Sequence, residues 1–169
     1  MLLFKIVSKY FWAIAFLITC SHVLFFKAPS KADIEENPEA SQDYNKLKRG
    51  YLFWMNLPWI VMGIGCTIGR VPTVFHYFRP RDGNPFVIAW WVTLFILYIL
   101  DFYWIFFCKG AEKVVKYRMI SYYSFGKSGK ISDTKIVKLM HLLILSVGLI
   151  VATCMWTTDT PIPSFLTGD

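Results

Sequence analysis

The fold is decided by residues 86–108, which read FVIAWWVTLFILYILDFYWIFFC. This run is longer than the roughly 20 apolar residues that cross the hydrocarbon core of a bilayer as a helix, so it predicts a transmembrane helix. Asp101 is the only charged residue in it. Because a carboxylate inside a membrane is costly unless it is paired or neutral, Asp101 is a candidate functional residue.

The composition of the whole chain is that of a membrane protein. Of its 169 residues, 56% are hydrophobic and 17% are charged, whereas a soluble domain averages about 25% charged residues. The net charge is +7, but excess Lys and Arg in a membrane protein is typical of cytoplasmic loops. No motif of a nucleic-acid-binding fold accompanies this charge, so we expect no direct nucleic-acid partner.

Three further apolar segments flank this run, and together they predict an all-α membrane protein with four spans in a single domain. The predicted spans are residues 6–26, 51–70, 86–108 and 136–156, with polar loops at 27–50 and 109–135. Neither loop is long enough to form a core of its own. The second loop begins with apolar residues at helical spacing among Lys and Arg, which is typical of a short helix lying on the membrane surface.

The distribution of Lys and Arg predicts the orientation. With four spans, both termini lie on one side, which would carry five basic residues, while the opposite side would carry thirteen, counting those at the ends of the spans. Short loops rich in Lys and Arg stay in the cytoplasm. We therefore expect both termini outside and the loops 27–50 and 109–135 inside, in the inner (plasma) membrane of a bacterium.

This orientation places His22, Asp101 and His141 at a similar depth in the inner half of the bilayer. Three interpretations remain open. The residues could lock the helices together by hydrogen bonds, relay protons or ions, or use the two histidines as axial ligands of a haem iron. We favour the first, and we predict no cofactor and no metal.

Small residues at helical spacing predict close helix packing. The residues concerned are Gly63, Gly65, Gly69, Gly148 and Ala152. Gly65 and Gly69 have GxxxG spacing, and Gly148 and Ala152 repeat it, so another helix can approach closely at both places. That helix belongs either to the same chain or to a second copy, and the sequence favours neither.

The connection between the second and third spans contains a second polar cluster. Its members are His76, Arg79, Arg81 and Asp82. Phe75, Tyr77 and Phe78 in the same connection suit the headgroup level of a membrane, where aromatic rings are enriched. We interpret the cluster as an interface anchor with a local Arg–Asp pair, and a ligand or lipid-headgroup site is the alternative.

No motif of an enzyme is found in the sequence. It lacks the nucleophile, metalloprotease and nucleotide-binding patterns, and none of its four cysteines forms a CxxC pair. We therefore expect a non-catalytic membrane subunit that anchors or senses at the membrane. Its partners would be the lipid bilayer and either further copies of itself or a cytosolic protein, for example in a defence or secretion system.

The second loop is the predicted docking surface for a cytosolic partner or for anionic lipid. Its basic residues are Lys109, Lys113, Lys116, Arg118, Lys127 and Lys130. The alternative function is a small transporter, channel, or haem or proton-relay subunit that uses Asp101, His22 and His141.

Overall fold

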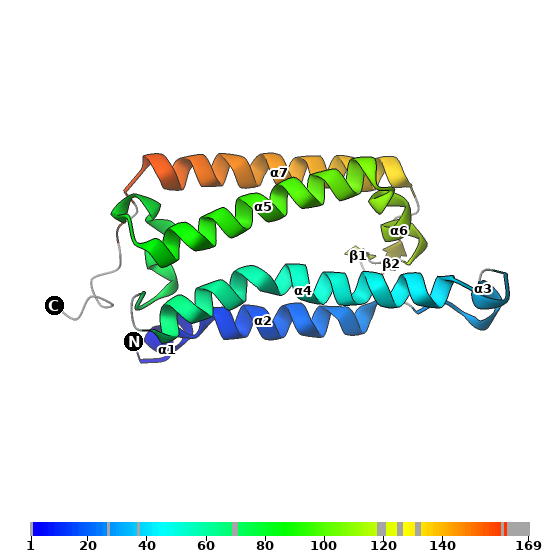
Figure 1. Cartoon of the computed structure of the whole chain (residues 1–169), viewed down its shortest axis with the longest axis horizontal. Helices are drawn as coiled ribbons and strands as arrows, with labels where there is room; N and C mark the ends of the chain where they lie inside the picture. Colours follow the sequence, from blue (N-terminus) through cyan, green and yellow to red (C-terminus); the bar gives the residue numbers. More distant parts are fainter. Residues whose placement is uncertain are drawn as a thin grey trace.

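The computed structural model describes residues 2–26, 28–36, 38–68, 71–117, 121–124, 127–130, 133–159 and 161. These residues form a mainly helical bundle with one small hairpin (Figure 1). The α-helices are α1 (Leu2–Lys9), α2 (Phe11–His22), α3 (Lys31–Glu36), α4 (Ala40–Thr67), α5 (Pro85–Phe107), α6 (Gly110–Lys116) and α7 (Thr134–Thr157). Short 3-10 turns are η1 (Val23–Phe25), η2 (Val74–Phe78) and η3 (Pro80–Asp82), and the strands are β1 (Ser121–Ser124) and β2 (Lys127–Lys130).

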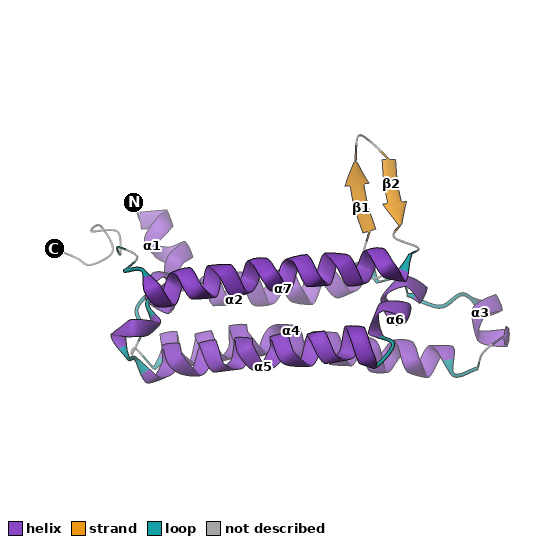
Figure 2. Cartoon of the chain, turned by 90° about the horizontal axis from the view of Figure 1, so that it is seen from above, coloured by secondary structure: helices purple, strands orange, loops and turns teal. Residues whose placement is uncertain are grey.

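Four helices, α2, α4, α5 and α7, run along the long axis of the molecule (Figures 1 and 2). Helix α2 packs on α4, α4 packs on α5, and α5 packs on α7, so each helix contacts its neighbour in the sequence. The amino terminus and the end of α7 lie at one end of the bundle, whereas α3, α6 and the hairpin lie at the other (Figure 1). We call these the terminal end and the loop end.

Helices α5 and α7 are long and apolar enough to cross a membrane, with 23 and 24 residues. Helices α1 and α2 add a third candidate span if they are counted as one, although the chain bends by 63° between them. The prediction of a transmembrane helical protein is thus supported by two or three candidate spans among the described residues. Helix α4 is longer than either, but Asn56, Pro58 and its glycines make it less apolar.

Two boundaries differ from the prediction. The segment expected to span from residue 6 is broken at Tyr10, and α1 turns toward η2, where Phe4 stacks on Phe75 with ring centroids 5.8 Å apart. Helix α4 begins at Ala40 instead of near 51, so much of the polar loop 27–50 is helical. Apolar character sets where a helix is buried in lipid, but it does not set where the helix begins.

The predicted surface helix of the second loop is shorter than expected. Helix α6 ends at Lys116, and residues 121–124 form β1, which pairs antiparallel with β2. The sequence SYYS favours a strand, and this short hairpin is a local addition to a chain that is helical as predicted. Helix α6 also buries one face, Ala111 and Val114, against Ile105 of α5 and Val137 of α7.

Buried side chains gather at the two ends of the bundle. At the terminal end, Met62, Tyr77, Trp90, Trp91 and Ala152 belong to one core. At the loop end, a second core contains Val23, Phe26, Tyr44 and Tyr117. None of the described residues of α2 is buried, and α7 buries only Val137 and Ala152. Exposed apolar side chains therefore cover most of the sides, as contact with lipid requires.

Candidate functional site

Asp101 and His141 lie at the same level of the contact between α5 and α7. On one side of them Ile105 packs with Val137, and on the other the ring of Tyr98 lies against Gly148. The imidazole of His141 interacts electrostatically with the carboxylate of Asp101. Both residues are half-buried. The two helices thus carry an acid and a base opposite each other within the candidate spans.

The backbone fixes the orientation of the His141 ring. Its Nδ1 lies 2.9 Å from the carbonyl oxygen of Val137, one turn earlier in α7. Because a carbonyl only accepts hydrogen bonds, Nδ1 carries a proton in this contact and Nε2 is the nitrogen that can exchange one. This arrangement suits either a permanent polar contact between the helices or a proton acceptor beside the carboxylate.

His22 belongs to the other helix pair. Its ring stacks on Tyr51 of α4 and meets the edge of Phe26, with centroids 5.9 Å apart in both cases. Gly65 of α4 lies opposite Phe86 of α5, and counting along the two helices from that contact brings Tyr51 level with Asp101. The helices separate toward this end of the bundle (Figure 1). The three-residue cluster and the haem interpretation therefore stay predictions.

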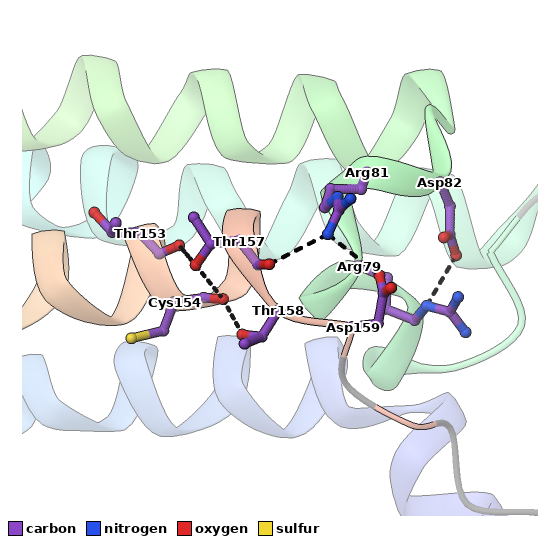
Figure 3. Close-up of polar contacts among 8 residues, drawn as sticks. All are labelled: Arg79, Arg81, Asp82, Thr153, Cys154, Thr157, Thr158 and Asp159. Carbon is purple, nitrogen blue, oxygen red and sulfur yellow. Dashed lines mark hydrogen bonds and ion pairs between the residues drawn. The ribbon is translucent and has the colours of Figure 1, made fainter.

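The polar residues between α4 and α5 find partners within the chain (Figure 3). Arg79 Nε lies 3.2 Å from Asp82 Oδ2, and His76 Nδ1 lies 3.0 Å from the hydroxyl of Thr73. Arg81 points toward α7, donating to the carbonyl of Thr157 at 3.2 Å and lying 3.7 Å from Asp159. These contacts favour the anchor interpretation, because each guanidinium already has an acidic neighbour.

Tyr77 lies in the core at the terminal end of the bundle. The sequence pattern did not predict that it is buried. It has no exposed surface (0%), its hydroxyl donates to the carbonyl of Met62 at 2.9 Å, and its own carbonyl accepts from Trp91 Nε1 at 2.9 Å. Burial raises the pKa of the phenol, and the neighbouring Cys66 thiol adds to the effect. Tyr77 therefore packs inside the protein, and its position at headgroup level stays a prediction.

The small residues predicted to allow close helix packing are positions where an aromatic side chain packs directly against the helix backbone. A methyl group on Gly63 would lie 2.7 Å from Trp12 Cε3, and one on Gly148 would lie 2.7 Å from Tyr98 Cε2. Gly65 is covered in the same way by Tyr77, and Ala152 belongs to the core of the terminal end. These contacts lie within one chain. Gly69 lies outside the described residues.

The predicted docking residues lie at the loop end. Lys109 and Lys116 are exposed and Lys113 is half-buried, on the side of α6 that Ala111 and Val114 leave free. The ammonium of Lys116 lies 5.5 Å from the ring centre of Tyr117. Strand β2 runs from Lys127 to Lys130 in a hairpin that projects sideways from the bundle (Figure 2). Arg118 lies outside the described residues.

No protein-family model, curated protein or solved structure matches this chain.

Proposed function

We propose that this chain is a non-catalytic integral membrane subunit that crosses the bilayer four times and docks a cytosolic protein at its loop end. The observation that carries the proposal is the asymmetry of the bundle. The terminal end is closed by Tyr77 and its aromatic neighbours, whereas α3, α6, the first turns of α4 and the hairpin all extend from the loop end (Figures 1 and 2). Loops of this kind present side chains for binding on a rigid support.

Helix α4 is the fourth span in this proposal. It has 28 residues, enough to cross a bilayer of about 30 Å with turns to spare. Its polar side chain Asn56 is only 3% exposed, and the amide donates to the Leu52 carbonyl at 2.7 Å and contacts Cys20 Sγ at 3.6 Å. A span can hold such a residue when the side chain faces a neighbouring helix instead of lipid.

With four spans, the distribution of Lys and Arg determines the orientation of the chain in the membrane. The loop end then carries thirteen of the eighteen Lys and Arg residues, so it faces the cytoplasm and both termini face outward across a bacterial plasma membrane. Single cysteines replacing Lys31 and Lys127, in a background without the native cysteines, should be protected in intact cells from a thiol reagent that cannot cross membranes. One replacing Lys5 should react. The reverse pattern would contradict the orientation.

The docking surface is formed by α6 and the hairpin. Lys109, Lys113 and Lys116 surround the free side of α6, and α6 is held by its buried face, so the cations stand on a fixed support. A basic surface of this kind fits an acidic patch of a cytosolic protein. The bound form would be a hetero-complex, with further copies of the chain as the alternative partner.

Purification in mild detergent, followed by identification of the co-purifying proteins, tests this function. Replacing Lys109, Lys113 and Lys116 by Gln should remove a cytosolic partner, and raising the salt concentration should weaken its binding because exposed charges are screened. The matched control replaces Lys5 and Lys9 at the terminal end and should keep the partner. Recovery of every cytosolic partner by the triple variant would refute the docking surface.

A proton relay is the second candidate, and the electrostatic interaction between Asp101 and His141 favours it. An imidazole and a carboxylate at one level of a membrane protein form a pair that can accept and release protons. Proton flux into liposomes containing the purified protein would test it. Flux that depends on a pH gradient and disappears in Asp101→Asn supports the relay, and equal flux in that variant or in empty liposomes excludes it.

A further inference from the structure

The first turns of α4 carry an open hollow of about 460 Å³ that the proposed function does not use. It is lined by Pro38, Ser41, Gln42, Asn45, Lys46 and Arg49. Ala40 and Tyr44 of the same turns are buried on the opposite side, where Tyr117 donates to the Ala40 carbonyl. The helix therefore has an inner side fixed to the bundle and an outer side that is hollowed.

The chemistry of the hollow suits an anion. It offers the two cations Lys46 and Arg49 and the neutral donors of Ser41, Gln42 and Asn45, and none of these described lining residues is acidic. The nearby carboxylate of Asp43 acts on Tyr117, on the inner side, where it adds to the effect of burial in raising the pKa of that phenol. Arg binds phosphate oxygens in pairs, and Lys adds a point charge.

The hollow also lies at the right depth for a phospholipid headgroup. Tyr51 begins the apolar part of α4. At about 1.5 Å per residue, Arg49 stands about 3 Å and Lys46 about 8 Å beyond Tyr51. The headgroup layer extends roughly 5–8 Å beyond the hydrocarbon on each side, so both cations reach the level of the lipid phosphate.

An apolar strip continues from the hollow toward the terminal end. Phe53 lies one helical turn beyond Arg49 and is 56% exposed, and Ile60 and Ile64 farther along are 42% and 47% exposed. Residues separated by three or four positions share a side of a helix, so acyl chains of a lipid held at Arg49 can follow this strip. A soluble phosphate would leave the strip without a role.

We propose that this hollow binds the headgroup of an anionic phospholipid. Arg49 and Lys46 hold the phosphate, while Asn45 hydrogen-bonds a hydroxyl group of a glycerol headgroup. The site is separate from the docking residues of α6. It gives the membrane a defined contact that holds α4 at a fixed depth.

Native mass spectrometry of the purified full chain with added phosphatidylglycerol or phosphatidylcholine tests the proposal. The wild type should retain phosphatidylglycerol at least tenfold better than phosphatidylcholine. The variant Lys46→Gln/Arg49→Gln should lose this preference, and Asn45→Asp, which adds a carboxylate to the hollow, should weaken retention. The matched control Lys113→Gln/Lys116→Gln should retain the lipid like the wild type.

Three results would overturn the proposal. They are equal retention of the two lipids by the wild type, unchanged retention by Lys46→Gln/Arg49→Gln, and loss of retention in the α6 control. Glycerol 3-phosphate serves as the headgroup without acyl chains, and binding as tight as that of the lipid would identify a soluble phosphate as the occupant and overturn the lipid assignment. Circular dichroism must show equal helix content in all variants, and Asn45→Asp replaces the double variant if that one loses helix.

Discussion

Gly65 and Tyr77 should be coupled energetically, because the glycine leaves the space that the tyrosine hydroxyl occupies. A methyl group on residue 65 would collide with Tyr77 Oη and lie 3.1 Å from Phe86 Cβ. The tyrosine cannot swing aside, since its carbonyl is bonded to the Trp91 indole and its ring is enclosed. Overpacking costs about 1–3 kcal/mol, while alanine gains about 1 kcal/mol over glycine in a helix. Gly65→Ala should therefore destabilise the protein by up to about 2 kcal/mol.

Removing the hydroxyl should reverse the sign of that effect. Tyr77→Phe alone loses the hydrogen bond to the Met62 carbonyl, at a cost of about 1 kcal/mol. In the Tyr77→Phe background the collision with Oη is absent, so Gly65→Ala should be neutral or stabilising by up to about 1 kcal/mol. The coupling between the two substitutions is then about 1–3 kcal/mol.

Unfolding in detergent micelles, titrated with a denaturing detergent and followed by circular dichroism, measures all four proteins of this cycle. Tyr103→Phe is the matched control, because Tyr103 is 58% exposed on α5, and its effect should be small and additive with Gly65→Ala. A coupling below about 0.5 kcal/mol between residues 65 and 77 would refute the reasoning, since independent sites add within that margin.

Three further effects are expected. Asp101→Asn and His141→Gln should show a coupling of about 0.6–2 kcal/mol in the same unfolding assay, as polar pairs between membrane helices do, and additive effects would exclude the contact. Lys109 has φ of 55°, a left-handed conformation costly for all but glycine, so Lys109→Gly should be neutral or stabilise by up to about 1 kcal/mol, and destabilisation would contradict this. Burial raises the pKa of Tyr77 and of Tyr117, so the folded state holds these protons more tightly. The stability they contribute is complete below pH 10 and should fall above it, at most about 1.4 kcal/mol per pH unit for each group. Tyr77→Phe should reduce the fall of the unfolding free energy with pH. An unchanged pH dependence would argue against the burial of the Tyr77 phenol.

The individual helices could be predicted where local signals agree. Residues 86–108 closely match α5, because the apolar run is framed by Pro85 at the first turn and by Asn84, whose side chain accepts from the Phe86 amide at 3.0 Å. Helix α7 begins in the same way, after Asp133 accepts from the Lys135 amide at 2.8 Å. Such caps lie within a few residues of the helix that they start, so the sequence reveals them.

The candidate sites depend on contacts between residues that are far apart in the sequence. The sequence predicts such contacts less well than it predicts individual helices. Tyr77 is a residue type that is enriched at membrane interfaces, but the space above Gly65 and the hydrogen bond to the Met62 carbonyl hold it inside the protein. Depth along the membrane predicts that Asp101 and His141 lie at one level, and in the structure the two residues interact electrostatically across α5 and α7. The same reasoning does not decide which helix pair holds His22, since depth says nothing about direction around a helix axis.

The packing of each long helix against its neighbour in the sequence has a consequence for biosynthesis. Among the described long helices, α2 packs mainly on α4, and α7 packs on α5 and on the short helix α6. A ribosome delivers these segments in the order in which they pack, so each arriving helix finds its partner already synthesised. Contacts between sequence neighbours also close short loops, which makes assembly fast. The chain can thus mature as it is translated, without waiting for its last helix.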